Sequence, residues 1–272
     1  MHTGSDRVWQ DRPDGSHATL ALAGATNFRS LGGLPAAGGR RIRPHALMRA
    51  DRLAALTSDD WTTLAGTGIA TICDLRSESE RAEHPNRTPP QLAVRELHCD
   101  IRNDLRADPA LARLLLDEPT ARGAERVMIE IYRRFPAYMG GTLATLVERL
   151  LAGGAPLLVH CSAGKDRTGF VIAMLLHALE VPDELIRQDY LASRTWPGAD
   201  SHRASLEARL GAIIPPHELP AAVDTVLDVR EVYLEAAMDA LWAEFGSVAR
   251  YLETAAGLST ERVARLRDHL LG

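Results

Sequence analysis

The stretch from residue 155 to residue 179, APLLVHCSAGKDRTGFVIAMLLHAL, decides the fold of this 272-residue chain. Its first six residues, APLLVH, predict a short buried strand because they are almost entirely apolar. A loop that contains two glycines, CSAGKDRTG, follows the strand. The next ten residues, FVIAMLLHAL, are apolar on all sides and predict a buried helix. A strand, a tight loop and a helix in this order indicate an α/β protein.

The loop places Cys161 at the end of the strand and Arg167 six residues later, at the start of the helix. This spacing suits anion binding, because backbone amides ahead of a helix N-terminus form a nest for a phosphate-sized dianion. Arg167 can hold two oxygens of that anion with its planar guanidinium. The expected substrate-binding residues are Ser162, Ala163, Gly164, Lys165, Asp166 and Arg167.

The same positive field stabilises a thiolate at Cys161. A thiolate that faces phosphorus favours nucleophilic attack, a phosphocysteine intermediate and its hydrolysis by water. Because the loop amides and Arg167 stabilise the charge of the transferred group, we expect no metal and no other cofactor.

Residues 160–169, HCSAGKDRTG, resemble the HCxxxxxR[ST]G motif of the cysteine-dependent protein tyrosine phosphatases. The blocks NFRSLGG (27–33), RADRL (49–53) and DLRSESERAEHP (74–85) are similar to those of bacterial tyrosine/serine phosphatases of the mycobacterial PtpB type. The resemblance implies a protein-tyrosine-phosphatase-like fold, with a mostly parallel central sheet flanked by helices. Because the connections after residue 182 are short and contain no flexible linker, we expect a single phosphatase domain over residues 1–272, with an N-terminal extension (1–26) and C-terminal helices (229–272), rather than an appended helical domain. The resemblance implies a helical lid at about 183–228; the alternative is a set of static helices that complete the core.

Residues next to the nucleophile have expected roles in the same chemistry. His160 suits orienting the loop by a hydrogen bond to its backbone, although it could be only a histidine at the end of a strand. The resemblance favours a hydrogen bond from the Thr168 hydroxyl to the sulfur, over a role in merely starting the helix. Cys73 and Cys99 are expected to be inert buried thiols.

Lys165 is the sole lysine among 31 basic residues, and it lies in the loop. Its flexible stem and compact charge predict that it reaches a second phosphate or another anionic group of the substrate. The alternative is a lysine that is merely solvated.

Two residues are candidates for the general acid that protonates the leaving oxygen. Asp166 lies between two cations, which favour its carboxylate and therefore a base or structural role. Asp74 ends a predicted strand, at the edge where α/β sheets bind ligands, but it could instead pair with Arg76 or Arg29. The sequence leaves both open.

The rest of the chain alternates short apolar runs with helical patterns as far as residue 182. After an irregular, glycine-rich beginning at 27–39, the pattern predicts strands at 69–75 and 92–99. Helices are predicted from Thr57 or Ser58 to about Leu64, at 103–116 and over 125–151. Nearly everything after Pro182 is helix-like, and 230–246 is its clearest amphipathic segment.

Composition limits the other function classes. A net charge of −5 argues against nucleic-acid binding. The chain shows no apolar stretch long enough for a transmembrane segment and no cleavable signal, so we expect a cytoplasmic monomer, with export by another route left open. The resemblance implies phosphorylated proteins as substrates, phosphotyrosine first, with phosphoserine and phosphothreonine as further candidates. The Lys-Asp pair of the loop also resembles phosphoinositide phosphatases, so phosphoinositides are a further candidate. The alternatives are a rhodanese-type sulfurtransferase, against which Arg167 and Thr168 argue, and a noncatalytic phosphate-binding module.

Overall fold

A five-stranded sheet forms the centre of the computed structural model, which describes residues 20–101 and 108–272. The strand order is β1-β2-β5-β3-β4; β1 runs antiparallel to β2, and the other neighbours are parallel. The strands are β1 (Arg29–Ser30), β2 (Leu47–Ala50), β3 (Thr71–Asp74), β4 (Arg95–His98) and β5 (Leu157–His160). The predicted α/β fold with a mostly parallel sheet is confirmed.

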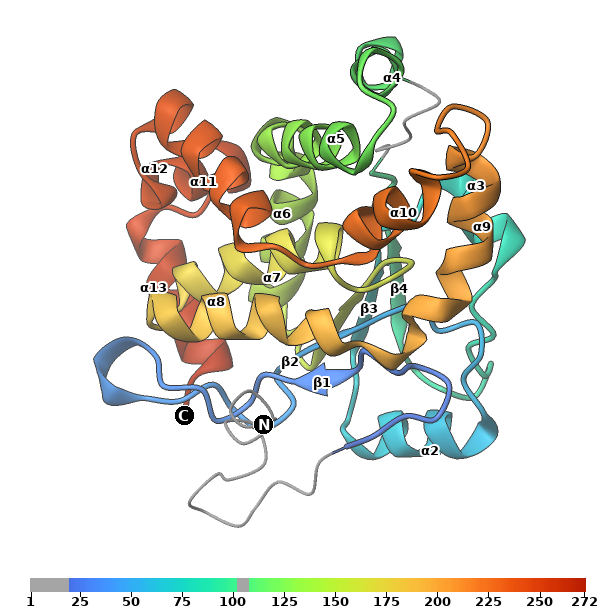
Figure 1. The fold of residues 1–272 in the computed structure, drawn as a ribbon. Coiled ribbons are helices and arrows are strands. Elements are labelled where there is room, and N and C mark those ends of the chain that lie inside the picture. Colours follow the sequence, from blue (N-terminus) through green and yellow to red (C-terminus); the bar gives the residue numbers. More distant parts are fainter. Residues whose placement is uncertain (1–19, 102–107) are drawn as a thin grey trace, which may run out of the picture.

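Helices cover both faces of this sheet, and most of them lie on one side (Figure 1). They are α2 (Ser58–Gly66), α3 (Glu78–Glu83), α4 (Pro109–Asp117), α5 (Ala121–Arg133), α6 (Phe135–Leu151), α7 (Asp166–Ala178), α8 (Asp183–Leu191), α9 (Asp200–Leu210), α10 (Leu219–Leu227), α11 (Glu231–Phe245), α12 (Val248–Ala256) and α13 (Thr260–Leu270). Short 3-10 turns lie at Ala37–Gly39, Ala192–Thr195 and Pro197–Ala199. In the described ranges, no helix has both the length and the apolar character that crossing a membrane requires.

Alternation along the strands divides the core into two clusters. Leu157 and Val159 of β5 point into the larger cluster, which the helices after residue 108 fill. Leu158 points to the other face, where Trp61 and Leu64 of α2 cover it. Because both faces are buried, β5 contains apolar residues at successive positions, as the sequence showed.

The predicted strands and most predicted helices are present. β3, β4 and β5 lie within the predicted segments, and α2, α4 and α11 match predicted helices. The helical character after Pro182 is confirmed by α8 to α13. Part of the predicted helix at 103–116, and most of the extension at 1–26, lie outside the described residues.

One predicted helix is wrong, because 125–151 is divided into α5 and α6 at Arg134. Pro136 lies in the first turn of α6. A proline there lacks an amide hydrogen and would clash with the carbonyl four residues earlier, so α5 cannot continue through it. The first of the two helices also begins earlier than predicted, where the Thr120 hydroxyl accepts a hydrogen bond from the Gly123 amide.

The strands β1 and β2 were not predicted. In β2 the charged Arg49 interrupts the apolar run, yet all four residues are buried between β1 and β5. The burial of Arg49 depends on Asp189, which lies 140 residues later in the sequence. No local pattern can therefore indicate that strand.

Candidate active site

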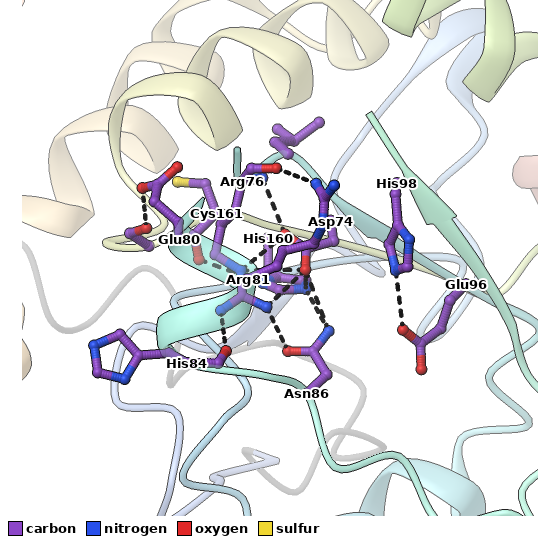
Figure 2. A network of polar contacts seen from close by, with 12 residues as sticks. Asp74, Arg76, Glu80, Arg81, His84, Asn86, Glu96, His98, His160 and Cys161 are labelled. Carbon is purple, nitrogen blue, oxygen red and sulfur yellow. Dashed lines mark hydrogen bonds and ion pairs between the residues drawn. The ribbon is translucent and has the colours of Figure 1, made fainter. Parts of the chain in front are cut away.

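The predicted loop lies at the carboxyl edge of the sheet. Asp74 at the end of β3 is in register with His160 at the end of β5. Cys161 follows β5 directly, and α7 begins five residues later at Asp166. The topology thus brings the nucleophile candidate, both general-acid candidates and Arg167 to one edge of the sheet, part of which is seen in Figure 2.

Three consecutive carbonyl groups of the loop accept hydrogen bonds from outside it. The pairs are the Arg52 amide to Ser162 O at 3.1 Å, Asn27 Nδ2 to Ala163 O at 2.8 Å and Arg49 Nη2 to Gly164 O at 2.6 Å. In a planar trans peptide the N–H points away from the C=O. The next three amides therefore point to the opposite side, and one of them, Gly164 N–H, donates to Cys161 Sγ at 3.2 Å.

Gly164 is required at its position by both conformation and space. Its φ is +69°, in the left-handed region that favours glycine. A Cβ atom there would lie 2.4 Å from the carbonyl oxygen of Ala50 at the end of β2. The loop can therefore pack directly on β2 only with glycine at 164.

A buried ion-pair cluster supports the loop from behind. Arg29 Nε donates to Asp189 at 2.7 Å, and Arg49 Nη1 donates to the other oxygen of the same carboxylate. Burial would raise the pKa of Asp189, but the charges of the two arginines lower it, so the carboxylate is ionised. Burial and the charge of Arg49 lower the pKa of Arg29 to about 10. The cluster joins the NFRSLGG and RADRL blocks to helix α8.

Cys161 and Thr168 are both shielded from solvent. Cys161 is 2% exposed and Thr168 is fully buried. Within the described part of the chain, Thr168 Oγ1 has no hydrogen-bond partner. Its proton is therefore available to the sulfur or to a bound anion, and its assistance to the leaving thiolate stays a prediction.

Arg167 is held by Glu80, a residue that the sequence analysis did not single out. Nη1 and Nη2 of Arg167 each donate to one Glu80 oxygen at 2.7 Å, and Nη1 also donates to the carbonyl of Leu75 at 3.2 Å. Burial lowers the pKa of Arg167, but Glu80 and the charge of Cys161 outweigh it and raise that pKa. Glu80 takes one edge of the guanidinium, so the edge formed by Nε and Nη2 can still hold two oxygens of an anion.

Glu80 owes its place to the start of α3. Ser77 caps this helix, and the Ser77 amide donates to Glu80 Oε2 at 2.8 Å while the Glu80 amide donates to Ser77 Oγ at 3.3 Å. The other oxygen of Glu80 accepts from Ser162 Oγ at 2.5 Å. Burial would raise the pKa of Glu80, but Arg167 and these donors hold it far below its usual range. Ser77 and Glu80 have the SxxE spacing of a capping box, and this is the pattern in the sequence that could have indicated the position of Glu80.

Asp74 and His160 belong to a buried polar network (Figure 2). Asp74 is 1% exposed and accepts from Arg76 Nη2 at 2.7 Å and Nε at 2.9 Å. Burial works to raise the pKa of Asp74, but Arg76 and His160 lower it. Burial lowers the pKa of His160 to about 4, so its ring is neutral at pH 7. His160 Nδ1 lies 3.3 Å from the carbonyl oxygen of Cys161, the contact through which it could orient the loop.

Asp166 and Lys165 share a different environment. Asp166 Oδ1 accepts from Tyr132 Oη at 2.7 Å and from Lys165 Nζ at 3.0 Å, and its side chain is 25% exposed. Lys165 is not solvated, because it is only 4% exposed. Its Nζ donates to the carbonyls of Val226 at 2.9 Å and Asp228 at 3.2 Å, where α10 ends. Carbonyls at a helix C-terminus attract cations, and a second phosphate could recruit Lys165 only by replacing them.

The remaining cysteines lie in or against the core. Cys73 is fully buried in β3, and Cys99 is half-buried after β4. A hydrogen bond with Cys99 and burial raise the pKa of Cys73, which keeps it a thiol. Across the described residues, no cluster of three histidine, cysteine or acidic side chains is arranged to hold a metal ion.

Comparison with known proteins agrees with this geometry. The model of the tyrosine phosphatase family matches residues 20–272. The triple specificity protein phosphatase PtpB of Mycobacterium tuberculosis is 34% identical, over 94% of this chain and all of its own length. A Cupriavidus necator protein named provisionally as a tyrosine-protein phosphatase is also 34% identical, over 93% of this chain and 88% of its own. A tyrosine-protein phosphatase of Nostoc commune is 28% identical over 58% of this chain and 52% of its own. This chain therefore belongs to the tyrosine phosphatase family and is an enzyme of that class.

Proposed function

We propose that Cys161 is the nucleophile of a phosphate monoester hydrolysis that needs no metal. Its thiolate attacks phosphorus, so that an S–P bond forms while the bond from phosphorus to the ester oxygen breaks. Water then attacks the phosphocysteine, orthophosphate leaves and the thiolate returns. The observation that supports this most is the set of three loop carbonyls bound from behind, because it turns the following amides to the side of Cys161.

Arg167 stabilises the transferred phosphoryl group in this mechanism. Glu80 fixes the guanidinium through Nη1 and Nη2 and leaves its second edge to two oxygens of the phosphate. A cation fixed before the reaction stabilises the developing charge without reorganisation. Ser162, Ala163, Gly164, Lys165 and Asp166 contribute backbone amides to the same site, and Thr168 assists the departing sulfur.

Asp166 is the general acid that the geometry favours over Asp74. A general acid must carry a proton and reach the leaving oxygen. Asp74 is buried, has its pKa lowered and accepts hydrogen bonds from Arg76 on both oxygens. Asp166 is partly exposed beside the loop, and among the described residues the donors to its carboxylate hold Oδ1. In the first step Asp166 gives its proton to the leaving oxygen, and in the second step it takes one from the attacking water.

Phosphotyrosine in proteins is the first substrate, as in the family. Phosphoserine, phosphothreonine and phosphoinositides are a second class; one relative is named a triple specificity protein phosphatase, which supports more than one kind of substrate. Helices α9 and α10 would form the lid, because Lys165 links the end of α10 to the loop. Helix α8 belongs instead to the scaffold, since the ion pairs of Asp189 fix it beneath the loop.

The test is hydrolysis of p-nitrophenyl phosphate in the presence of a chelator, with and without vanadate. We expect turnover that vanadate inhibits, and rapid quenching followed by mass spectrometry should find one phosphoryl group on the peptide that contains Cys161. Turnover that the chelator abolishes, or that persists in Cys161→Ser, would contradict the mechanism. Transfer of sulfur from thiosulfate to cyanide would indicate the rhodanese alternative, and vanadate binding without turnover would indicate the noncatalytic module. Phosphotyrosine peptides and phosphoinositides then serve as paired substrates.

A further inference from the structure

Two buried tyrosine hydroxyl groups form a chain that ends on Asp166. Tyr132 of α5 is fully buried, and its hydroxyl lies 2.7 Å from Asp166 Oδ1. Tyr190 of α8 is 1% exposed, and its hydroxyl lies 2.9 Å from that of Tyr132. The carbonyl of Arg230 is 3.4 Å from the Tyr190 hydroxyl. Three helices, α5, α7 and α8, therefore meet at one line of polar atoms.

The direction of this chain follows from the number of protons. A carboxylate can only accept, so the single proton of the Tyr132 hydroxyl points to Asp166. The Tyr132 oxygen is then the acceptor for Tyr190. Burial, together with the charge of Asp166, raises the pKa of both tyrosines well above the usual value, so both keep their protons as donors.

The two oxygens of Asp166 differ as a consequence. Oδ1 accepts from Tyr132 and, at 3.0 Å, from Lys165 Nζ. No group of the described residues donates to Oδ2, and the side chain is 25% exposed. When the carboxyl group is protonated, two donors that already point at Oδ1 keep the proton off that oxygen.

We propose that Tyr132 is a positioning residue, supported by Tyr190, that fixes Asp166 so that Oδ2 carries the catalytic proton toward the leaving oxygen. The inference rests on the proposed role of Asp166 as the general acid. A carboxylic acid that could rotate would present its proton to the leaving oxygen only part of the time, because efficient transfer requires hydrogen-bond reach and alignment. The hydroxyl of Tyr132 removes that rotation without touching the substrate.

The test uses Tyr132→Phe, which removes only the hydroxyl, and a series of aryl phosphates that differ in the pKa of the leaving phenol. A general acid contributes about 10²–10⁴-fold when the leaving group is poor, and much less when the phenolate leaves unaided. We expect kcat/KM, which reports the steps up to departure of the phenol and not the later hydrolysis of the phosphocysteine, to fall about tenfold on phenyl phosphate and less than about twofold on 2,4-dinitrophenyl phosphate. Vanadate affinity should stay within about twofold, because the amide nest is intact.

Tyr251→Phe is the matched control. Tyr251 is also fully buried, and its hydroxyl donates to the carbonyl of Pro136 at 2.9 Å, within the helical core. Tyr251→Phe also removes a hydroxyl oxygen, yet the ratio of kcat/KM on the two aryl phosphates should equal that of the wild type. Tyr190→Phe is the second variant, which carries the test if Tyr132→Phe does not fold. It should shift the substrate ratio in the same direction by about threefold, since it weakens Tyr132 as a donor.

A double variant with Asp166→Asn separates the two proposals. If Tyr132 acts through Asp166, Tyr132→Phe should cause no further loss in the Asp166→Asn background. An equal loss of kcat/KM on both phosphates, or a further loss of kcat/KM in that background, would show that Tyr132 is merely structural. A strong leaving-group effect in Asp166→Asn with none in Tyr132→Phe and Tyr190→Phe refutes the positioning role alone. No leaving-group effect in Asp166→Asn overturns the acid assignment and the inference with it.

Discussion

The replacement Glu80→Gln keeps the size and shape of the side chain that holds Arg167 and removes its charge. The carboxylate accepts from Arg167 twice at 2.7 Å, from Ser162 Oγ at 2.5 Å and from the Ser77 amide at 2.8 Å. A glutamine has one oxygen, so two of these four donors would face its NH₂ group.

The magnitude follows from those two lost contacts. A hydrogen bond to a charged group contributes about 1.5–3 kcal/mol. Because the Glu80 side chain is 32% exposed, water replaces part of the loss, and the low end of the range applies. We expect a loss of about 3 kcal/mol in the free energy of unfolding, which lowers Tm by roughly 6 °C or more. Loss of the fixed guanidinium should also lower kcat/KM at least about tenfold.

The dependence on pH identifies the charge as the cause. The pKa of Glu80 is lowered from the usual 4.5 by folding, so its contribution to stability is present above pH 4.5 and is lost as the pH falls below that value. Glutamine does not titrate. The deficit of the variant should therefore shrink by about 1 kcal/mol between pH 7 and pH 4.

The assay is urea unfolding at both pH values together with steady-state kinetics, and Glu78→Gln is the control. Glu78 lies in the same first turn of α3 but is exposed. Its replacement should change the unfolding free energy by less than about 0.5 kcal/mol. The reasoning is refuted if the two variants behave alike, or if the deficit of Glu80→Gln is the same at pH 7 and pH 4.

Four further predictions concern the loop and its supports. Cys161→Ser should abolish turnover, because a hydroxyl has no comparable thiolate state, and its vanadate affinity should stay within about threefold of the wild type. Calorimetric titration measures that affinity, and weak binding would mean that the sulfur builds the nest. Arg167→Lys should lower kcat at least about a hundredfold, as one ammonium cannot replace the two-point contact, and near-normal kinetics would remove Arg167 from its role. Asn27→Ala removes the donor to Ala163 O and also the oxygen that accepts from Arg29 Nη1 and Ser193 Oγ, so it should cost at least about 2 kcal/mol of stability. It should raise the Kd for phosphate several-fold, whereas unchanged phosphate affinity would show that the loop orients itself. Folding lowers the pKa of His160 to about 4, so the free energy of unfolding should be constant in this respect above pH 6.5 and should fall by on the order of 2 kcal/mol at pH 5. Urea unfolding of His160→Gln should show a weaker dependence on pH, and an unchanged dependence would assign it to other groups.

The sequence predicted the elements whose pattern is local. β5, the loop and α7 are encoded by one continuous run, and Gly164 and Arg167 have the spacing that an anion nest requires. The same analysis missed β2, since Arg49 is charged and its burial depends on partners far along the chain, above all Asp189. It also divided the general-acid assignment evenly, because the pairing of Asp74 with Arg76 is a matter of side-chain geometry.

Contacts of long range explain the other differences. Glu80 appears in the sequence as a helix-capping residue, and its second use depends on Arg167, 87 residues away. Lys165 seemed to be a cation directed at substrate, but the end of α10 lies next to it in the fold. In both cases the residue type was informative, and its partner could not be read from nearby positions.

The support of the loop by Asn27, Arg49 and Asp189 has a consequence for the order in which the enzyme matures. The loop residues leave the ribosome after the first two supports and before the third. Until residue 189 has been made and α8 has docked, Arg49 lacks its carboxylate partner. A nascent chain that ends just after Gly169 would contain the whole motif without a fixed nest. The nucleophile that we propose at Cys161 would thus be a product of late assembly, and we expect that the motif transplanted into another strand and helix would not bring the activity with it.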